Sequence, residues 1–481
     1  MPVLIWFAAS PLEAPHSSPD GVTGRLRAAA AAQQAPAMAR LRQLEAQGQA
    51  RAIRPLWIVN AVAFEAPSAV IVAAASWPAV TRVTWDTTYT RLPEPPAAQI
   101  ALAADGGLSV TANISVTKAP LLWSLGITGS GVVIASLDTG VDYANLDLAP
   151  RWRGGINSWF DPYGQCALPC DAAGPGFTGH GSQTVGLMVG SAYTTTALGM
   201  APGAQWIAAR IFNAQGQASE SAIHQAFQWV LDPDGDPGTD DAPDIVNASW
   251  NLVNPGGCDL TFAPDLQALV WAGIVPVFAA GNSGPSANTA LSPANNPDAV
   301  AVGAVDEAGQ VAASSSRGPT SCGTGTTRLF PDLAAPGVDV LTTDGVLAGS
   351  PPRYTRVSGT SFAAPHVAGG LALLISACPQ LSLPELRVAL TYTAQPLPGP
   401  GAPANNDTGA GQLDVWAAYQ ALGAGACVST LPTATPTAVP TLAPSATLIP
   451  TAAPTSTPTP TQVLATVGLT LYLSLIERAA P

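Results

Sequence analysis

Residues 358–369 read Ser-Gly-Thr-Ser-Phe-Ala-Ala-Pro-His-Val-Ala-Gly and place one serine, Ser361, on a tight Gly-Thr turn before an apolar helix. Pro365 suits the first turn of that helix, where a missing N–H costs little, and apolar residues follow at helical spacing. A serine in this position points out of the turn. Because its hydroxyl is a weak nucleophile, the chemistry requires a base to take its proton and an acid to orient that base.

Three upstream segments supply these partners. Asp138 ends an apolar run that predicts a buried strand, and open α/β sheets place their chemistry at the carboxyl ends of strands. His180 lies between two glycines ahead of an apolar helical run, and Asn282 follows a second predicted strand. We interpret His180 as the base, Asp138 as the residue that orients it, and Asn282 as a hydrogen-bond donor to the developing oxyanion.

Each of these residues also has an ordinary structural explanation. A single aspartate commonly caps a turn, a single histidine commonly lies in a core, and an asparagine beside glycine or a serine before a helix commonly shapes the backbone. The chain order and the flanking sequences agree at all four positions, which favours the catalytic interpretation.

A second alternative is an aspartic peptidase, because Asp-Thr-Gly occurs at 138–140 and again at 407–409. Such an enzyme uses two carboxylates that share a proton. The second copy lies in a turn-rich stretch with no predicted strand to hold its carboxylate, so we disfavour this dyad.

The chain resembles the subtilases, and bacillopeptidase F-type members in particular. The resemblance covers about residues 113–420 and includes Asn-Ala-Ser-Trp at 247–250, Ser-Arg-Gly-Pro at 316–319 and Ala-Pro-Gly at 335–337. It implies an α/β fold with a mostly parallel seven-stranded sheet and helices on both faces, preceded by a small α+β propeptide. Gln183 stands where many relatives carry a second histidine, and Ser-Trp-Asn at 249–251 replaces a commoner Ser-Leu-Gly or Ser-Trp-Gly, which leaves the substrate preference open.

The function implied by the resemblance is that of an extracellular or cell-surface serine endopeptidase, made as a self-processing precursor. We expect polypeptide substrates, a monomer, no required cofactor, and the chain's own propeptide as an intramolecular inhibitor. The alternative is a catalytically inactive subtilase-like surface binding module. No triad or oxyanion residue is missing, which favours the enzyme.

Two segments are expected to flank an extended substrate backbone, which would pair with them as an added strand. The expected substrate-binding residues are Gly216, Gln217, Ala218, Ser249, Trp250, Asn251 and Gly281.

The domain boundaries follow from composition and from the resemblance. We expect an uncertain leader remnant at 1–20, the propeptide at 21–110, the catalytic domain at 113–427, a Thr/Pro-rich linker at 428–462 and a short apolar tail at 463–481. The alternative for the second region is an ordinary N-terminal domain. Residues 3–9 form too short an apolar run for a secretory signal, and the tail is shorter than the roughly twenty residues of a spanning helix, so we interpret it as a surface retention or sorting segment.

Charge and cysteine content narrow the partners and the compartment. The net charge is −13, which argues against a nucleic-acid partner. All six cysteines follow residue 165, which fits disulfides in an oxidising compartment better than a zinc site. Fifteen pairings are possible, and we favour Cys378 with Cys427 and Cys166 with Cys170.

An acidic loop raises the question of a metal. Asp232, Asp234 and Asp236 alternate with other residues and could hold calcium, although the full EF-hand pattern is absent. A solvated loop is the preferred interpretation, and calcium remains the alternative.

Overall fold

The computed structural model describes residues 1–8, 19–91, 99–100, 109–171, 173–174, 177–190, 196–345, 354–397, 404–424 and 427. The predicted linker and tail lie outside these residues, as does most of the stretch expected to contain the propeptide cleavage point. All of the described residues belong to one compact unit.

The core of the larger part is a seven-stranded sheet in which all pairings are parallel, which confirms the predicted fold. Its strands, in their order across the sheet, are β18 (Leu333–Pro336), β17 (Val300–Val305), β16 (Val275–Ala279), β15 (Ile245–Ala248), β8 (Val133–Asp138), β13 (Gln205–Arg210) and β9 (Trp159–Phe160). The inner strands are nearly continuous apolar runs because both faces are covered.

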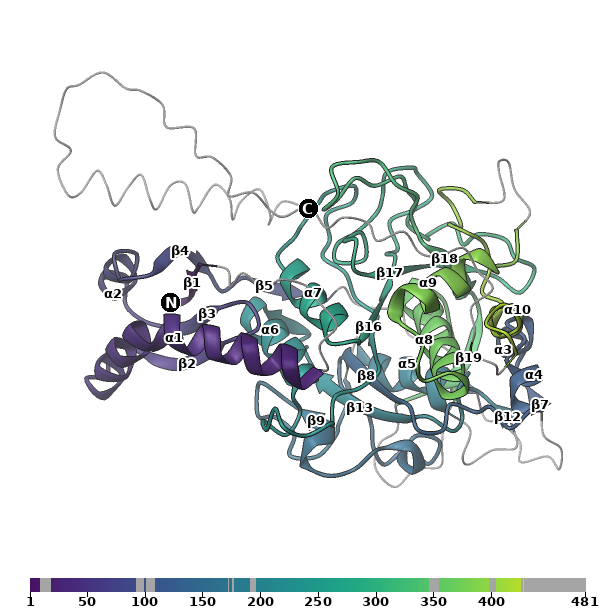
Figure 1. Cartoon of the computed structure of the whole chain (residues 1–481), viewed down its shortest axis with the longest axis horizontal. Helices are drawn as coiled ribbons and strands as arrows, with labels where there is room; N and C mark the ends of the chain where they lie inside the picture. The colour runs from purple at the N-terminus through teal and green to yellow at the C-terminus, as the bar shows by residue number, and fades with distance from the viewer. Residues whose placement is uncertain are drawn as a thin grey trace, which may run out of the picture. The chain divides into compact units, whose positions relative to one another are not determined.

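Helices pack on both faces of this sheet (Figure 1). One face carries α5 (His180–Val189), α8 (Thr360–Ala377), α9 (Leu383–Tyr392) and α10 (Val415–Ala421), and the other carries α6 (Glu220–Leu231) and α7 (Ala263–Trp271). Successive side chains of a strand alternate between these faces: Trp206 and Ala208 join the first core, whereas Ile207 and Ala209 join the second. Helix α8 is long and apolar enough to cross a membrane, but it is mostly buried in this core.

A separate four-stranded antiparallel sheet forms the N-terminal domain, in the order β2-β3-β1-β4. Its elements are β1 (Pro2–Phe7), α1 (Pro19–Ala46), β2 (Arg51–Leu56), β3 (Ala61–Glu65), α2 (Ser68–Ala74) and β4 (Val80–Trp85). The α+β character agrees with the prediction. Residues 2–7, which we assigned to an uncertain leader remnant, form β1, an inner strand of this sheet. Its side chains are buried on both faces, so its sequence is a short apolar run without alternation.

The remaining described elements are short and mostly join or flank the two sheets. They are β5 (Thr88–Thr90), β6 (Gln99–Ile100), β7 (Ser109–Val110), α3 (Ala112–Val116), α4 (Ala119–Trp123), β10 (Ala173–Gly174), β11 (Phe177–Thr178), β12 (Thr196–Ala197), β14 (Gln217–Ser219), β19 (Val340–Thr343) and β20 (Tyr354–Val357), with 3₁₀ turns at Ala149–Arg151 and Ile156–Ser158.

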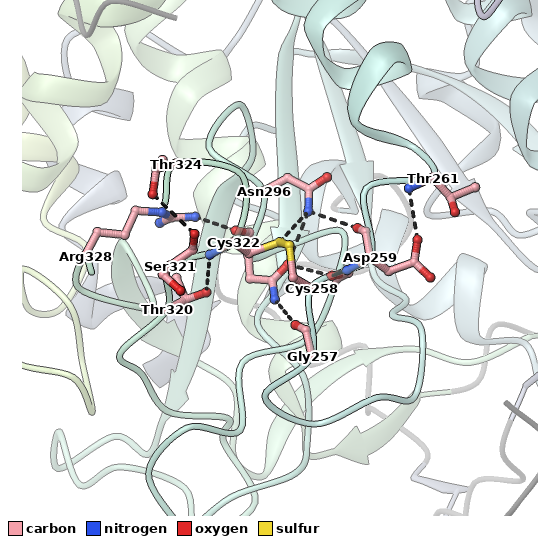
Figure 2. The surroundings of a disulfide bond; sticks show 12 residues. Gly257, Cys258, Asp259, Thr261, Asn296, Thr320, Ser321, Cys322, Thr324 and Arg328 are labelled. Carbon is pink, nitrogen blue, oxygen red and sulfur yellow. Dashed lines mark hydrogen bonds between the residues drawn. A yellow bond between two sulfur atoms is a disulfide. The ribbon is translucent and has the colours of Figure 1, made fainter. Parts of the chain in front are cut away.

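All six cysteines form disulfides. The predicted pairs Cys166–Cys170 and Cys378–Cys427 are confirmed, and Cys258 pairs with Cys322. Figure 2 shows the Asn296 amide directed at the third bond: its Nδ2 lies 3.7 Å from Cys322 Sγ and donates to Asp259 O at 3.3 Å. Asn296, from a third loop, therefore contacts both of the loops that this disulfide joins.

Candidate active site

Asp138 and His180 form a buried hydrogen-bonded pair. Asp138 is the last residue of β8 and His180 the first of α5, and each is only 2% exposed. His180 Nδ1 lies 2.7 Å from Asp138 Oδ1, which also accepts from Thr139 N at 2.7 Å. Because a carboxylate oxygen accepts, Nδ1 carries the proton and Nε2 is left with the lone pair that a general base needs.

Ser361 is the second residue of α8, directly after Gly359 and Thr360. Gly359 has φ +148°, a conformation that other residues rarely adopt, so glycine is suited to this sharp entry into the helix. The ring of His180 packs against Phe362, the residue after Ser361, with 5.3 Å between ring centroids. The packing of α5 on α8 thus brings the Asp138–His180 pair to the turn that carries Ser361.

Pro365 has a different role from the one predicted. It is the sixth residue of α8, in the second turn rather than the first. Without an N–H it cannot bond to the carbonyl of Ser361 four residues earlier. Ser249 Oγ donates to that carbonyl instead, at 2.7 Å, and Ser361 Oγ donates to Ser249 O at 3.2 Å.

Asn282 is exposed and oriented by α8. Its Oδ1 accepts from Thr360 N at 2.9 Å and from Thr360 Oγ1 at 3.0 Å. With the carbonyl side of the amide engaged, the Nδ2 side is a donor directed away from Thr360. A Cβ on Gly359 would lie 3.4 Å from that Nδ2, so glycine also keeps the space beside the amide open.

The predicted substrate-binding residues 216–218 form a strand edge that pairs with the chain's own N-terminal region. Strand β14 pairs antiparallel with β5, with Ala218 opposite Tyr89 and Gln217 opposite Thr90. Beyond the strand, Arg91 N donates to Gly216 O at 2.8 Å. An extended segment therefore lies along this edge.

The other predicted substrate-binding residues follow β15 and β16. The Trp250 ring packs among Phe227, Phe262 and Phe278 in the core, so its side chain is directed away from the strand edge. Asn251 Nδ2 donates to Ala279 O at 2.7 Å.

Gly281 lies against Leu291, a residue that no sequence pattern indicated. Gly281 has φ +108°, and a Cβ there would lie 2.5 Å from Leu291 Cδ1. Leu291 therefore occupies the space beside this glycine, next to Asn282.

The second Asp-Thr-Gly copy takes no part in this site. Asp407 pairs with Arg317 at 3.4 Å, while Asp138 pairs with His180. The two carboxylates have separate partners, so they do not form the shared-proton dyad of an aspartic peptidase.

The acidic loop gathers Asp232, Asp234 and Asp241, not Asp236. Asp236 Oδ1 instead accepts from Gly238 N at 3.0 Å. Asp232, whose side chain is 1% exposed, forms an ion pair with Arg27 of α1. Because a guanidinium already neutralises the buried carboxylate, these residues do not fit calcium while that pair is formed.

The fold and these side chains define a subtilisin-like α/β protein, and comparisons with known proteins agree. A model of the subtilase family matches residues 129–413. Bacillopeptidase F of Bacillus subtilis (strain 168) is 33% identical over 407 residues, which are 78% of this chain and 27% of that protein. Subtilisin E of the same organism is 32% identical over 61% of this chain and 68% of the relative, and the subtilisin of Bacillus pumilus is 33% identical over 60% and 92%.

The chain therefore belongs to the subtilase family of serine peptidases. It spans about a quarter of the length of bacillopeptidase F.

Proposed function

We propose that this chain is a serine endopeptidase in which Ser361 attacks the scissile carbonyl of a polypeptide. The observation that carries the proposal is the 2.7 Å Asp138–His180 pair, buried beside the turn that carries Ser361. His180 Nε2 takes the serine proton and later gives it to the leaving amine, while Asp138 holds the tautomer and stabilises the imidazolium. Asn282 Nδ2 and the Ser361 N–H stabilise the oxyanion.

The serine must turn toward His180 for this reaction. Its hydroxyl donates to Ser249 O at 3.2 Å, which is a long hydrogen bond and therefore a weak one. Catalytic hydrogen bonds commonly tighten only when substrate is bound, so this rotamer is compatible with the proposed role.

We propose that the N-terminal domain is an intramolecular inhibitor. Its segment Thr88–Arg91 already pairs with the strand edge at Gly216–Ser219 that a substrate would use. Asp86 strengthens the attachment, because its carboxylate accepts from Ser221 N at 2.9 Å and from Ser221 Oγ at 2.6 Å at the start of α6.

Further contacts spread this attachment over α6. Gln228 Oε1 accepts from Trp57 N at 2.7 Å, and Thr23 Oγ1 donates to Leu231 O at 3.2 Å. An active enzyme would then need this domain to be cut from the chain and released. The proposal has three further parts. The chain cuts itself within residues 91–113, the region from residue 1 to that point is the inhibitor, and the catalytic domain ends at residue 427.

The proposed location is extracellular or at the cell surface, with the protein as a monomer. Three disulfides support an oxidising compartment. The retention role of residues 463–481 stays a prediction.

The test compares purified full-length chain with its Ser361→Ala variant. Both are incubated with a fluorophosphonate probe and with casein, and the mass of each chain is followed. We expect labelling, casein cleavage and loss of the N-terminal region in the parent chain only. A correctly folded parent chain, freed of its N-terminal region, that takes no label and leaves casein intact would instead support the inactive binding module.

A further inference from the structure

The helix that begins with His180 has no capping side chain of its own. The N-cap residue of α5 is Gly179, at φ +69°, and it makes no side-chain cap. The first N–H groups of a helix have no partner within the helix, so they need acceptors from elsewhere. Because His180 is the first residue of this helix, whatever binds these groups also determines where the imidazole stands.

Asp171 supplies the missing acceptor from another part of the chain. Its Oδ2 accepts from Ser182 N at 2.8 Å and from Ser182 Oγ at 2.7 Å. Its Oδ1 accepts from Thr139 Oγ1 at 2.6 Å. The Thr139 hydroxyl in turn accepts from Gly181 N at 3.0 Å. One carboxylate thus connects the first turn of α5 with the residue that follows Asp138.

The hydrogen-bond donors around Asp171 indicate that its side chain is an ionised carboxylate. At least three hydrogen bonds are donated to the two carboxylate oxygens, an arrangement that suits an ionised group. Burial raises the pKa of Asp171, the hydrogen bonds from Thr139 and Ser182 oppose that rise, and the negative charge of Asp138 adds to it. Burying a carboxylate costs free energy, and a role in shaping the loop alone does not explain that cost.

The loop that carries Asp171 is fixed close to the same turn. Cys170, the preceding residue, is bonded to Cys166, and the Arg210 guanidinium lies 2.9 Å from Cys170 Sγ. The backbone of Cys170 also lies directly on the turn after Asp138, since a Cβ on Gly140 would be 1.9 Å from Cys170 O. Asp171 is therefore anchored at short range to the strand side of the pair.

We propose that Asp171 is a positioning residue, which holds the first turn of α5 against the turn after Asp138 and so sets the His180–Asp138 hydrogen bond. This inference rests on the proposed peptidase function. It predicts that loss of the carboxylate impairs the chemical step rather than substrate binding, because the residue touches the supports of the pair and not the strand edge at 216–218.

The experiment compares Asp171→Asn and Asp171→Ala with a matched control in the same loop. Asp161 also accepts backbone N–H groups, but these belong to Tyr163, Gln165 and Cys166 and not to α5. All variants are made in the full chain, matured, and measured for kcat, KM, the pH dependence of kcat/KM and thermal stability.

We expect kcat to fall about 100-fold in Asp171→Ala, the scale of an ångström-sized misplacement, and about tenfold in the isosteric Asp171→Asn, with KM unchanged. The acid limb of kcat/KM should move to lower pH, since removal of a nearby negative charge lowers the pKa of an imidazolium. Asp161→Asn should lower the melting temperature and leave kcat within about twofold.

A second measurement does not depend on activity. In the Ser361→Ala chain, the proton on His180 Nδ1 should give a strongly downfield NMR signal, which moves upfield or broadens in Asp171→Asn but not in Asp161→Asn. An unchanged signal together with unchanged kcat and acid limb would overturn the positioning role. Failure of the proposed function is a separate outcome: the signal would respond to Asp171→Asn while the parent chain takes no fluorophosphonate label.

Discussion

The two halves of the candidate site, Ser361 with Asn282 and Asp138 with His180, are held by contacts of different range. The serine half is built largely within its own motif and one neighbouring strand end, because Gly359 shapes the turn and Thr360 binds Asn282 Oδ1. The other half depends on Asp171, which lies in neither of the two motifs and reaches both.

This difference shows which part of the site's geometry is set within a short sequence motif and which part requires the folded tertiary structure. A motif whose residues contact one another carries its geometry with it. A pair whose supports lie on a third loop is placed correctly only when that loop is folded. Substitutions in the two halves should therefore fail in different ways.

The largest effect is expected in the serine half, from Asn282→Ala. Loss of the Nδ2 donor should lower kcat by a factor of about 10²–10³, the scale known for the oxyanion asparagine of subtilisin, a relative. Because alanine also removes the acceptor for Thr360 N, the matched variant is Asn282→Asp, which keeps an acceptor and loses the donor.

The comparison is made by kcat and melting temperature. Asn282→Asp should be at least as inactive as the alanine variant while retaining more thermal stability. An aspartate variant with near-normal kcat would contradict the role of Nδ2 as a donor to the oxyanion.

The second largest effect on kcat is expected in the Asp138–His180 half, from a substitution that disturbs the packing of α5. A Cβ on Gly181 would lie 1.9 Å from Gly140 O and 3.2 Å from Asp138 Cβ, so Gly181→Ala must push α5 away from the turn after Asp138. We expect kcat to fall about 100-fold with little change in KM. Gly238→Ala is the control, since this glycine remains in the catalytic domain and an added Cβ there would meet only Asp236 Oδ1, at 3.3 Å. Equal activity of both variants would show that α5 tolerates the shift.

The sequence was informative where local pattern and burial coincide. Apolar runs identified β8 and β16, and the turn at Ser361 was recognisable from its glycine and the helix that follows. The signal failed for β1, because a strand buried on both faces shows no alternation, and for the position of Pro365, because the helix begins earlier than its apolar spacing indicated.

Other features had no sequence signal at all. Asp171 lies nine residues before His180 in a stretch without periodicity, and its partners Thr139 and Ser182 become neighbours only when β8, α5 and the disulfide loop assemble. Leu291 is an ordinary apolar residue until Gly281 is placed against it. Long-range contacts of this kind are not encoded in spacing along the chain.

The smallest effect on activity is expected at another buried histidine, which belongs to the serine half alone and affects stability. His366 of α8 accepts from Asn113 Nδ2 at Nε2 and donates from Nδ1 to Phe362 O, so it is neutral, and burial lowers its pKa to about 4. A histidine with a lowered pKa contributes stability that is present above its unfolded value of 6.5 and is lost as the pH falls toward 4. The loss should reach about 3 kcal/mol near pH 4.

Urea unfolding of the Ser361→Ala chain between pH 4.5 and 7.5 tests this: His366→Gln should be less stable at pH 7.5 but lose less stability on acidification. Parallel curves of unfolding free energy against pH for the two chains would show that another group causes the acid sensitivity, and would contradict this role of His366.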